Sequence, residues 1–110
     1  MTQTVTVKID KALEPLIPDY LKDITRWLQQ MKDASEKGDF NIVRDLSHKM
    51  TGTGSGYGFD FITNIGTKLN KGAHEENATR IIKLCDELRD TLERVVVEYF
   101  EEDDDEEIFI

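Results

Sequence analysis

The sequence predicts an all-α protein, an antiparallel up-and-down four-helix bundle with a short extra N-terminal helix. Three observations lead to this fold class. Apolar residues recur at spacings of three and four along most of the chain. Helix-stop and helix-start signals divide that pattern into four long segments joined by short turns. No segment requires a sheet, and no repeat or linker divides residues 1–100, so we expect a single domain.

The chain begins with an extended lead-in over residues 4–10, where apolar residues alternate with polar ones. Asp10 can then cap a short helix that runs through Leu13 and that Pro15 ends. The next helix is strongly indicated because Pro18 suits a first helical turn. Its apolar residues are Ile17, Tyr20, Leu21, Ile24, Trp27, Leu28 and Met31.

Gly38 is predicted to end this helix, and Asp39 to cap a third one that begins at Phe40. Four closely spaced glycines weaken the far end of the third helix, so we place a break between Ser55 and Gly58.

A fourth helix begins near Phe59 and is predicted to stop at residues 70–72, which read Asn-Lys-Gly. The last and longest helix follows, from Ala78 to Tyr99, on an apolar seam with a period of about 3.5. Its run of three valines at 95–97 is its weakest part, because β-branched residues favour strands.

The most informative residue is His48, in the third predicted helix. With His48 at 0° on a helical wheel of about 100° per residue, Leu46 falls near 160° and Met50 near 200°. The imidazole therefore points away from the apolar stripe and toward solvent. A histidine kept for packing would lie inside that stripe. We expect His48 to act on something that arrives from outside.

The surroundings of His48 suit attack on a phosphoryl group. Neutral imidazole is a nucleophile available near physiological pH. Gly52 lies one turn later, near 40°, where its missing side chain leaves room for an incoming group. The incoming negative charge can be met by four candidate contacts. These are Arg44, Lys49, Thr51 and Ser55. Gly54 falls on the packed side and is expected to allow close helix contact.

The segment resembles the histidine phosphotransfer (HPt) domain family of two-component phosphorelays. The family pattern is a histidine, a lysine three positions later, and glycines at four and ten positions. Here His48, Gly52 and Gly58 match it, with Tyr57 before the second glycine. Thr51 departs from it, because the family usually has lysine there. The resemblance covers roughly residues 5–100.

The resemblance implies a phosphocarrier in cytoplasmic signal transduction, without a catalytic site of its own. A receiver-domain aspartyl phosphate, or a kinase, would phosphorylate His48, and another receiver aspartate would accept the group. No cofactor of its own is implied, since Mg²⁺ belongs to the receiver. The expected partners are response-regulator receivers and a sensor histidine kinase of ordinary or hybrid type, and the protein is expected to be a monomer. The docking face would surround His48 on the second and third predicted helices, with Tyr57 and Phe59 contributing.

Two other functions stay open. The first is a phosphate-independent docking bundle that binds a receiver or kinase, a reading that Thr51 favours. The second is the substrate domain of a chemotaxis-type kinase. A hydrolytic or redox enzyme is disfavoured, because the chain has no paired catalytic carboxylates or cofactor motif. His74 is expected to be a solvated residue at the start of the last helix, with no metal site, and Cys85 to be a buried hydrophobe.

The composition limits the classes of partner and the cellular compartment that we expect. Net charge is −9, and residues 101–107 are all acidic, so residues 101–110 form an acidic tail that we expect to be disordered. The nearly neutral remainder gives no footprint for nucleic acid. A single cysteine fits a reducing, cytoplasmic compartment. We expect no signal peptide and no membrane span. Met1 and the charged tail favour a free-standing protein, and a fragment of a hybrid kinase stays open as the alternative.

Overall fold

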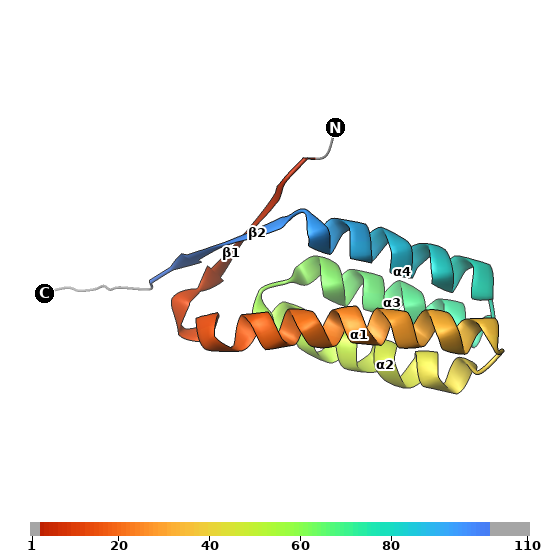
Figure 1. The fold of residues 1–110 in the computed structure, drawn as a ribbon. Coiled ribbons are helices and arrows are strands. Elements are labelled where there is room, and N and C mark those ends of the chain that lie inside the picture. The colour runs from red at the N-terminus through yellow and green to blue at the C-terminus, as the bar shows by residue number, and fades with distance from the viewer. Residues whose placement is uncertain (1–2, 102–110) are drawn as a thin grey trace, which may run out of the picture.

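The computed structural model describes residues 3–101 and is mostly helical, with four α-helices and two short strands (Figure 1). In chain order the elements are β1 (Val5–Asp10), the 3₁₀ helix η1 (Lys11–Leu16), α1 (Ile17–Glu36), α2 (Phe40–Thr53), the 3₁₀ helix η2 (Ser55–Tyr57), α3 (Asp60–His74), α4 (Ala78–Glu93) and β2 (Val95–Phe100). The tail beyond Glu101, including Ile108–Ile110, lies outside the described residues.

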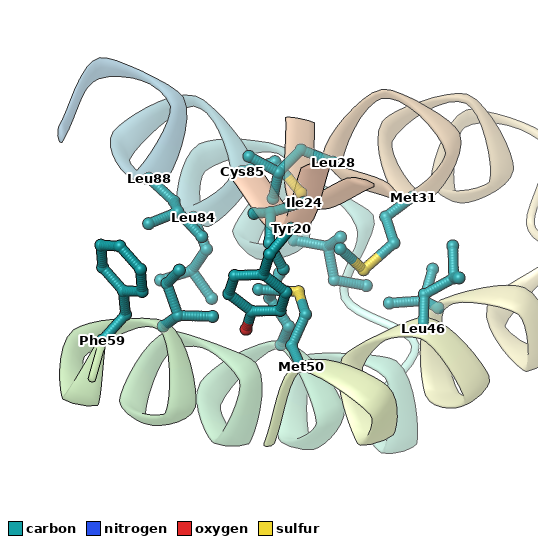
Figure 2. Close-up of a cluster of buried hydrophobic side chains, with 14 of the residues drawn as sticks. Tyr20, Ile24, Leu28, Met31, Leu46, Met50, Phe59, Leu84, Cys85 and Leu88 are labelled. Atoms are coloured by element: carbon teal, nitrogen blue, oxygen red, sulfur yellow. The ribbon is translucent and has the colours of Figure 1, made fainter. Parts of the chain in front are cut away.

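The helices enclose one apolar core. Helix α1 packs on α2 and α4, and α3 packs on the same two helices. Figure 2 shows side chains from all four helices meeting in the interior. The largest fully buried side chains include Phe59, Ile24, Leu28, Met50 and Leu88. The predicted four-helix content is therefore confirmed, and burial of these faces supplies the main stabilisation.

The start signals of the first elements are mostly confirmed. The Ala12 backbone N–H donates a 2.9 Å hydrogen bond to the Asp10 carboxylate, which caps η1. The prediction that Pro15 ends this helix is wrong, because η1 continues to Leu16 with the proline inside it. A proline is tolerated there since a short 3₁₀ helix has few internal hydrogen bonds to lose. Gly38 follows α1 with a φ of +75°, the left-handed conformation that glycine adopts without strain.

The prediction that the last helix reaches Tyr99 is wrong. Helix α4 ends at Glu93, and residues Val95–Phe100 form β2, which pairs in parallel with β1. Val5 lies opposite Val95 and Asp10 opposite Phe100. The expectation that no sheet is needed is therefore also wrong. The β-branched run prefers an extended backbone, and β1 supplies the hydrogen-bond partners that such a backbone requires.

The predicted stop at residues 70–72 is wrong as well, because α3 continues to His74. Gly72 is buried inside the helix, and a Cβ built on it would stand 3.1 Å from the Ile81 side chain of α4. This glycine allows close approach of two helices rather than a chain reversal. His74 is consequently the last residue of α3 and not a residue at the start of α4.

The corner after η2 joins the sheet to the helices. Gly58 has a φ of +95°, and a Cβ there would stand 3.2 Å from the buried Ile9 side chain of β1. Two separate constraints therefore select glycine at this position, namely left-handed backbone and contact with the sheet.

We predict that Gly58→Ala lowers the free energy of unfolding by more than Gly38→Ala. Both substitutions carry the left-handed backbone cost of about 1–2 kcal/mol, but a Cβ at Gly38 meets nothing within 4 Å whereas one at Gly58 meets Ile9. Urea denaturation of the two variants measures the difference. Equal losses would show that the Gly58–Ile9 contact contributes nothing.

Candidate functional site

The structure places His48 on the exposed face of α2. On the opposite face, Val43 and Met50 are fully buried and Leu46 is 9% exposed. The predicted orientation is thus confirmed, because the apolar side of α2 is buried against the core and His48 is exposed. In the part of the chain that the structure describes, His48 is exposed and forms no ion pair.

Gly52 leaves the surface beside His48 open. A Cβ built on Gly52 would meet no atom within 4 Å, and the residue is exposed. Neither helix packing nor an unusual backbone therefore explains glycine here. Since a helical side chain covers the surface one turn toward the N-terminus, any larger residue at this position would stand beside the imidazole.

Gly54 allows close helix contact, as predicted, whereas Gly52 faces open space. A Cβ on Gly54 would lie 2.6 Å from the backbone nitrogen of Thr63 on α3. A second close approach, which the sequence reasoning did not assign, occurs at Gly66 of α3, where a Cβ would lie 3.0 Å from the backbone nitrogen and Oγ1 of Thr51. Helices α2 and α3 are therefore in near-backbone contact at two levels around His48.

This contact fixes the position of Thr51. Its side chain is half-buried in the seam between α2 and α3, and its hydroxyl donates a 2.9 Å hydrogen bond to the Ser47 carbonyl. Thr51 thus flanks the His48 face from the α3 side, with its hydroxyl proton already engaged. A hydroxyl held in this way contributes no charge to the site.

Arg44 is only partly engaged, because its Nε is buried and has no hydrogen-bond partner within the described residues. Its guanidinium donates a 2.5 Å hydrogen bond to the Asn41 side-chain oxygen, one turn earlier on α2. The side chain is half-buried, and it makes no ion pair with an acid among residues 3–101. No acid in this part of the chain, including the neighbouring Asp45, therefore neutralises the Arg44 charge through an ion pair.

Ser55 lies beyond the end of α2, in η2, where α3 holds it. Its backbone nitrogen donates to Thr63 Oγ1 at 2.8 Å, and the two side-chain hydroxyl oxygens are 3.2 Å apart. The structure thus brings Ser55 to Thr63 and closes the α2–α3 corner with it. Thr63 was not among the candidate residues, and nothing in its local sequence pattern distinguishes it from an ordinary surface threonine.

Lys49 extends to the other side, over α1. Its ammonium nitrogen lies 5.8 Å from the centre of the Trp27 ring, within cation–π range. Beside it, between α1 and α2, runs an open groove of about 490 Å³ whose lining includes Ala34, Leu46 and the exposed Ile42. The groove adjoins the turn of α2 that carries His48.

The motif turn is built from stacked aromatic rings. Tyr57 stacks on Tyr20 with ring centres 4.3 Å apart, and the Tyr20 hydroxyl lies 2.9 Å from Thr53 Oγ1 at the end of α2. Burial raises the pKa of the Tyr20 hydroxyl, which keeps it neutral as a hydrogen-bonding group. The expectation that Phe59 contributes to a docking face is wrong, because Phe59 is completely buried.

A polar contact that the sequence did not reveal fixes the α2–α3 register directly beneath His48. Ser47 is fully buried, and its hydroxyl donates to the Arg44 carbonyl at 3.1 Å. The Asn70 side-chain amide of α3 donates to Ser47 Oγ at 3.1 Å. A buried hydroxyl needs such partners, so this pair resists rotation of α2.

The remaining reactive residue types do not form a site. Burial raises the pKa of the Cys85 thiol to about 12, so it stays protonated and inert, as predicted for a buried hydrophobe. Within residues 3–101, no three metal-binding side chains cluster together. Across the same residues, no helix has the length and apolar character needed to cross a membrane.

Comparison with known proteins adds no relative: no family model matches the chain, and no curated protein or solved structure matches it.

We predict that Gly52→Ala stabilises the fold while hindering reaction at His48. Alanine in an open helical position gains up to about 1 kcal/mol over glycine, and its methyl group narrows the approach to the imidazole. Thermal denaturation and the rate of His48 modification by diethyl pyrocarbonate measure the two effects.

Gly56→Ala is the matched control, because Gly56 also has open space around it but lies in η2, beyond the His48 helix. It should leave the His48 modification rate unchanged. Equal rates for wild type and Gly52→Ala would contradict a role for Gly52 in access.

Proposed function

We propose that this chain is a histidine phosphotransfer protein, built as an up-and-down helical bundle, that carries a phosphoryl group on His48. One observation carries the proposal: α2 presents an otherwise unused imidazole to solvent, and the turn after it holds a glycine with no structural requirement. The match of His48, Gly52 and Gly58 to the phosphotransfer pattern supports the same reading.

Phosphoryl transfer to His48 requires few groups from this chain. A ring nitrogen of neutral His48 attacks the phosphorus of an aspartyl phosphate on a receiver domain. The nitrogen–phosphorus bond forms as the acyl phosphate P–O bond breaks, the aspartate carboxylate leaves with the electron pair, and the imidazole proton passes to solvent. The reverse reaction delivers the group to a second receiver. Mg²⁺ on the receiver stabilises the transferring group, so His48 needs only orientation and access.

The docking face we propose lies on α1 and α2 around His48. The groove beside Lys49 offers an apolar floor at Ala34, Ile42 and Leu46, and Ile42 is 41% exposed. The groove is also lined by charged residues, including Asp33, Lys37 and Asp45. A mixed apolar and charged surface next to a reactive group suits a transient protein partner that must bring its own active site close. Tyr57 lies at the end of the same face and is half-buried.

Transfer from a receiver preloaded with labelled phosphate tests the proposal. Wild type should acquire acid-labile, base-stable label, His48→Gln should acquire none, and His74→Gln should label like wild type. Both histidines are exposed, so the second variant is a matched control for surface reactivity. Label that persists in His48→Gln would refute the assignment.

The main alternative is a phosphate-independent docking module, which the uncharged Thr51 favours. That alternative predicts measurable receiver binding, equal for wild type and His48→Gln, with no label on either. A chemotaxis-type substrate domain would instead accept label from a kinase and ATP but not from receivers. The same set of proteins therefore separates the three functions.

We predict that Thr51→Lys lengthens the lifetime of the phosphohistidine, because it places a cation where the wild type has only a hydroxyl already engaged with Ser47. The aliphatic stem must run along the α2–α3 seam, so Thr51→Gln, similar in stem but uncharged, controls for packing. Decay of acid-labile label measures the lifetime. Equal lifetimes for the Lys and Gln variants would show that charge at position 51 has no effect.

A further inference from the structure

We propose that Lys49 leaves the Trp27 ring when His48 is phosphorylated and neutralises the phosphoryl group, so that the Lys49–Trp27 pair both stabilises and reports the phosphorylated state. This inference rests on the proposed function of His48. It assigns to Lys49 the charge compensation that Thr51 cannot supply, and it makes Lys49 a positioning residue for the phosphoryl group.

Phosphorylation of His48 adds negative charge that nearby side chains must neutralise. A phosphoryl group adds between one and two negative charges and three strong acceptor oxygens. The other candidate donors beside His48 are less free to move than an exposed lysine, because Arg44 and Thr51 are both half-buried. One Arg44 guanidinium nitrogen donates to Asn41 while its Nε is buried, and the Thr51 hydroxyl donates to the Ser47 carbonyl.

Lys49 differs from these residues. Within residues 3–101 its ammonium forms no ion pair and no side-chain hydrogen bond; its contact is with the Trp27 ring at 5.8 Å. Asp45, one turn earlier, could pair with it, but the two are not within ion-pair distance. A cation–π contact on a half-exposed ring is weak compared with a charge-assisted hydrogen bond to a phosphoryl oxygen. The ammonium therefore has a reason to move once the phosphoryl group is present.

The Lys49 side chain also needs a route from the Trp27 ring to a group on His48. Consecutive helical residues diverge by about 100°, so His48 and Lys49 do not face each other directly. Gly52 falls at about 40° on the same wheel, between the two. A side chain at Gly52 would cover the surface between the imidazole and the ammonium, and that space is empty. The open position thus lets the long lysine stem bend toward a group on His48.

Phosphoramidate, a small donor, tests this without a docking partner. The donor P–N bond breaks as the bond to the His48 ring nitrogen forms, and the amine leaves as ammonium with the imidazole proton. Trp27 is the single tryptophan, so its emission is a direct reporter. In wild type, labelling of His48 should change Trp27 emission in step with the label.

Lys49→Met removes the charge but keeps a flexible apolar stem. Its labelled form should show no change in Trp27 emission, and its phosphohistidine should decay about two- to fivefold faster, the effect expected of one exposed charge pair. Lys49→Arg should restore the wild-type lifetime. Lys83→Met is the matched control, because it removes an exposed lysine from α4, a helix that packs on α1 and α3.

The outcomes separate the two proposals. Label on His48 with unchanged Trp27 emission and equal lifetimes in wild type and Lys49→Met would overturn the role of Lys49 and leave phosphotransfer intact. An emission change that persists in Lys49→Met would also overturn it. If neither phosphoramidate nor a loaded receiver labels His48, both proposals fail together.

Discussion

The close contact between α2 and α3 is the constraint on which the rest of this structure depends. Two glycines, Gly54 and Gly66, bring the helices together at a distance that a Cβ at Gly54 would prevent and a Cβ at Gly66 would strain. That contact sets the rotation of α2, because the buried Ser47–Asn70 hydrogen bond fits one register. With α2 held in this rotation, the His48 side chain faces solvent.

The same contact determines which side chains can serve His48. The hydroxyls on the α3 side are already bonded, since Thr51 donates to the Ser47 carbonyl within α2 and Ser55 bonds to Thr63 of α3. Across α2, Lys49 meets an aromatic face instead of a hydrogen-bond acceptor. The surface around His48 is therefore asymmetric, with half-buried groups, including Arg44 and Thr51, toward α3 and the exposed Lys49 toward α1. An asymmetric surface of this kind suits a carrier that must bind a charged group and then release it.

The sequence predicted the helices well where a single face is apolar, because a period of 3.6 leaves a clear stripe on α1 and α2. The prediction failed where the role of a residue depends on contacts that form only in the tertiary structure. Gly72 has the form of a stop signal, yet it is a packing position against Ile81. The valine run at 95–97 continues the spacing of α4, yet it pairs with β1, a partner some ninety residues away in the chain. A short stretch of sequence carries no signal of pairing between strands so far apart in the chain.

At the candidate site the sequence located the exposed imidazole and the open Gly52, because helix geometry alone fixes both. It could not locate the neighbours across the seam. Thr63 and Asn70 come from another helix, and their roles arise from the distance between backbones, which no pattern within α2 encodes. The likeness to phosphotransfer domains added the chemistry that geometry alone leaves open.

Site-resolved detection of the phosphohistidine tests the central claim most directly. The protein would be labelled with ¹⁵N in its two histidines, mixed with a receiver carrying an aspartyl phosphate, and observed by NMR through the ring nitrogens. The account predicts a phosphorus-coupled nitrogen on His48 alone, with the His74 ring unchanged. Coupling on both rings, or on neither while the receiver loses its phosphoryl group to solvent, would contradict it.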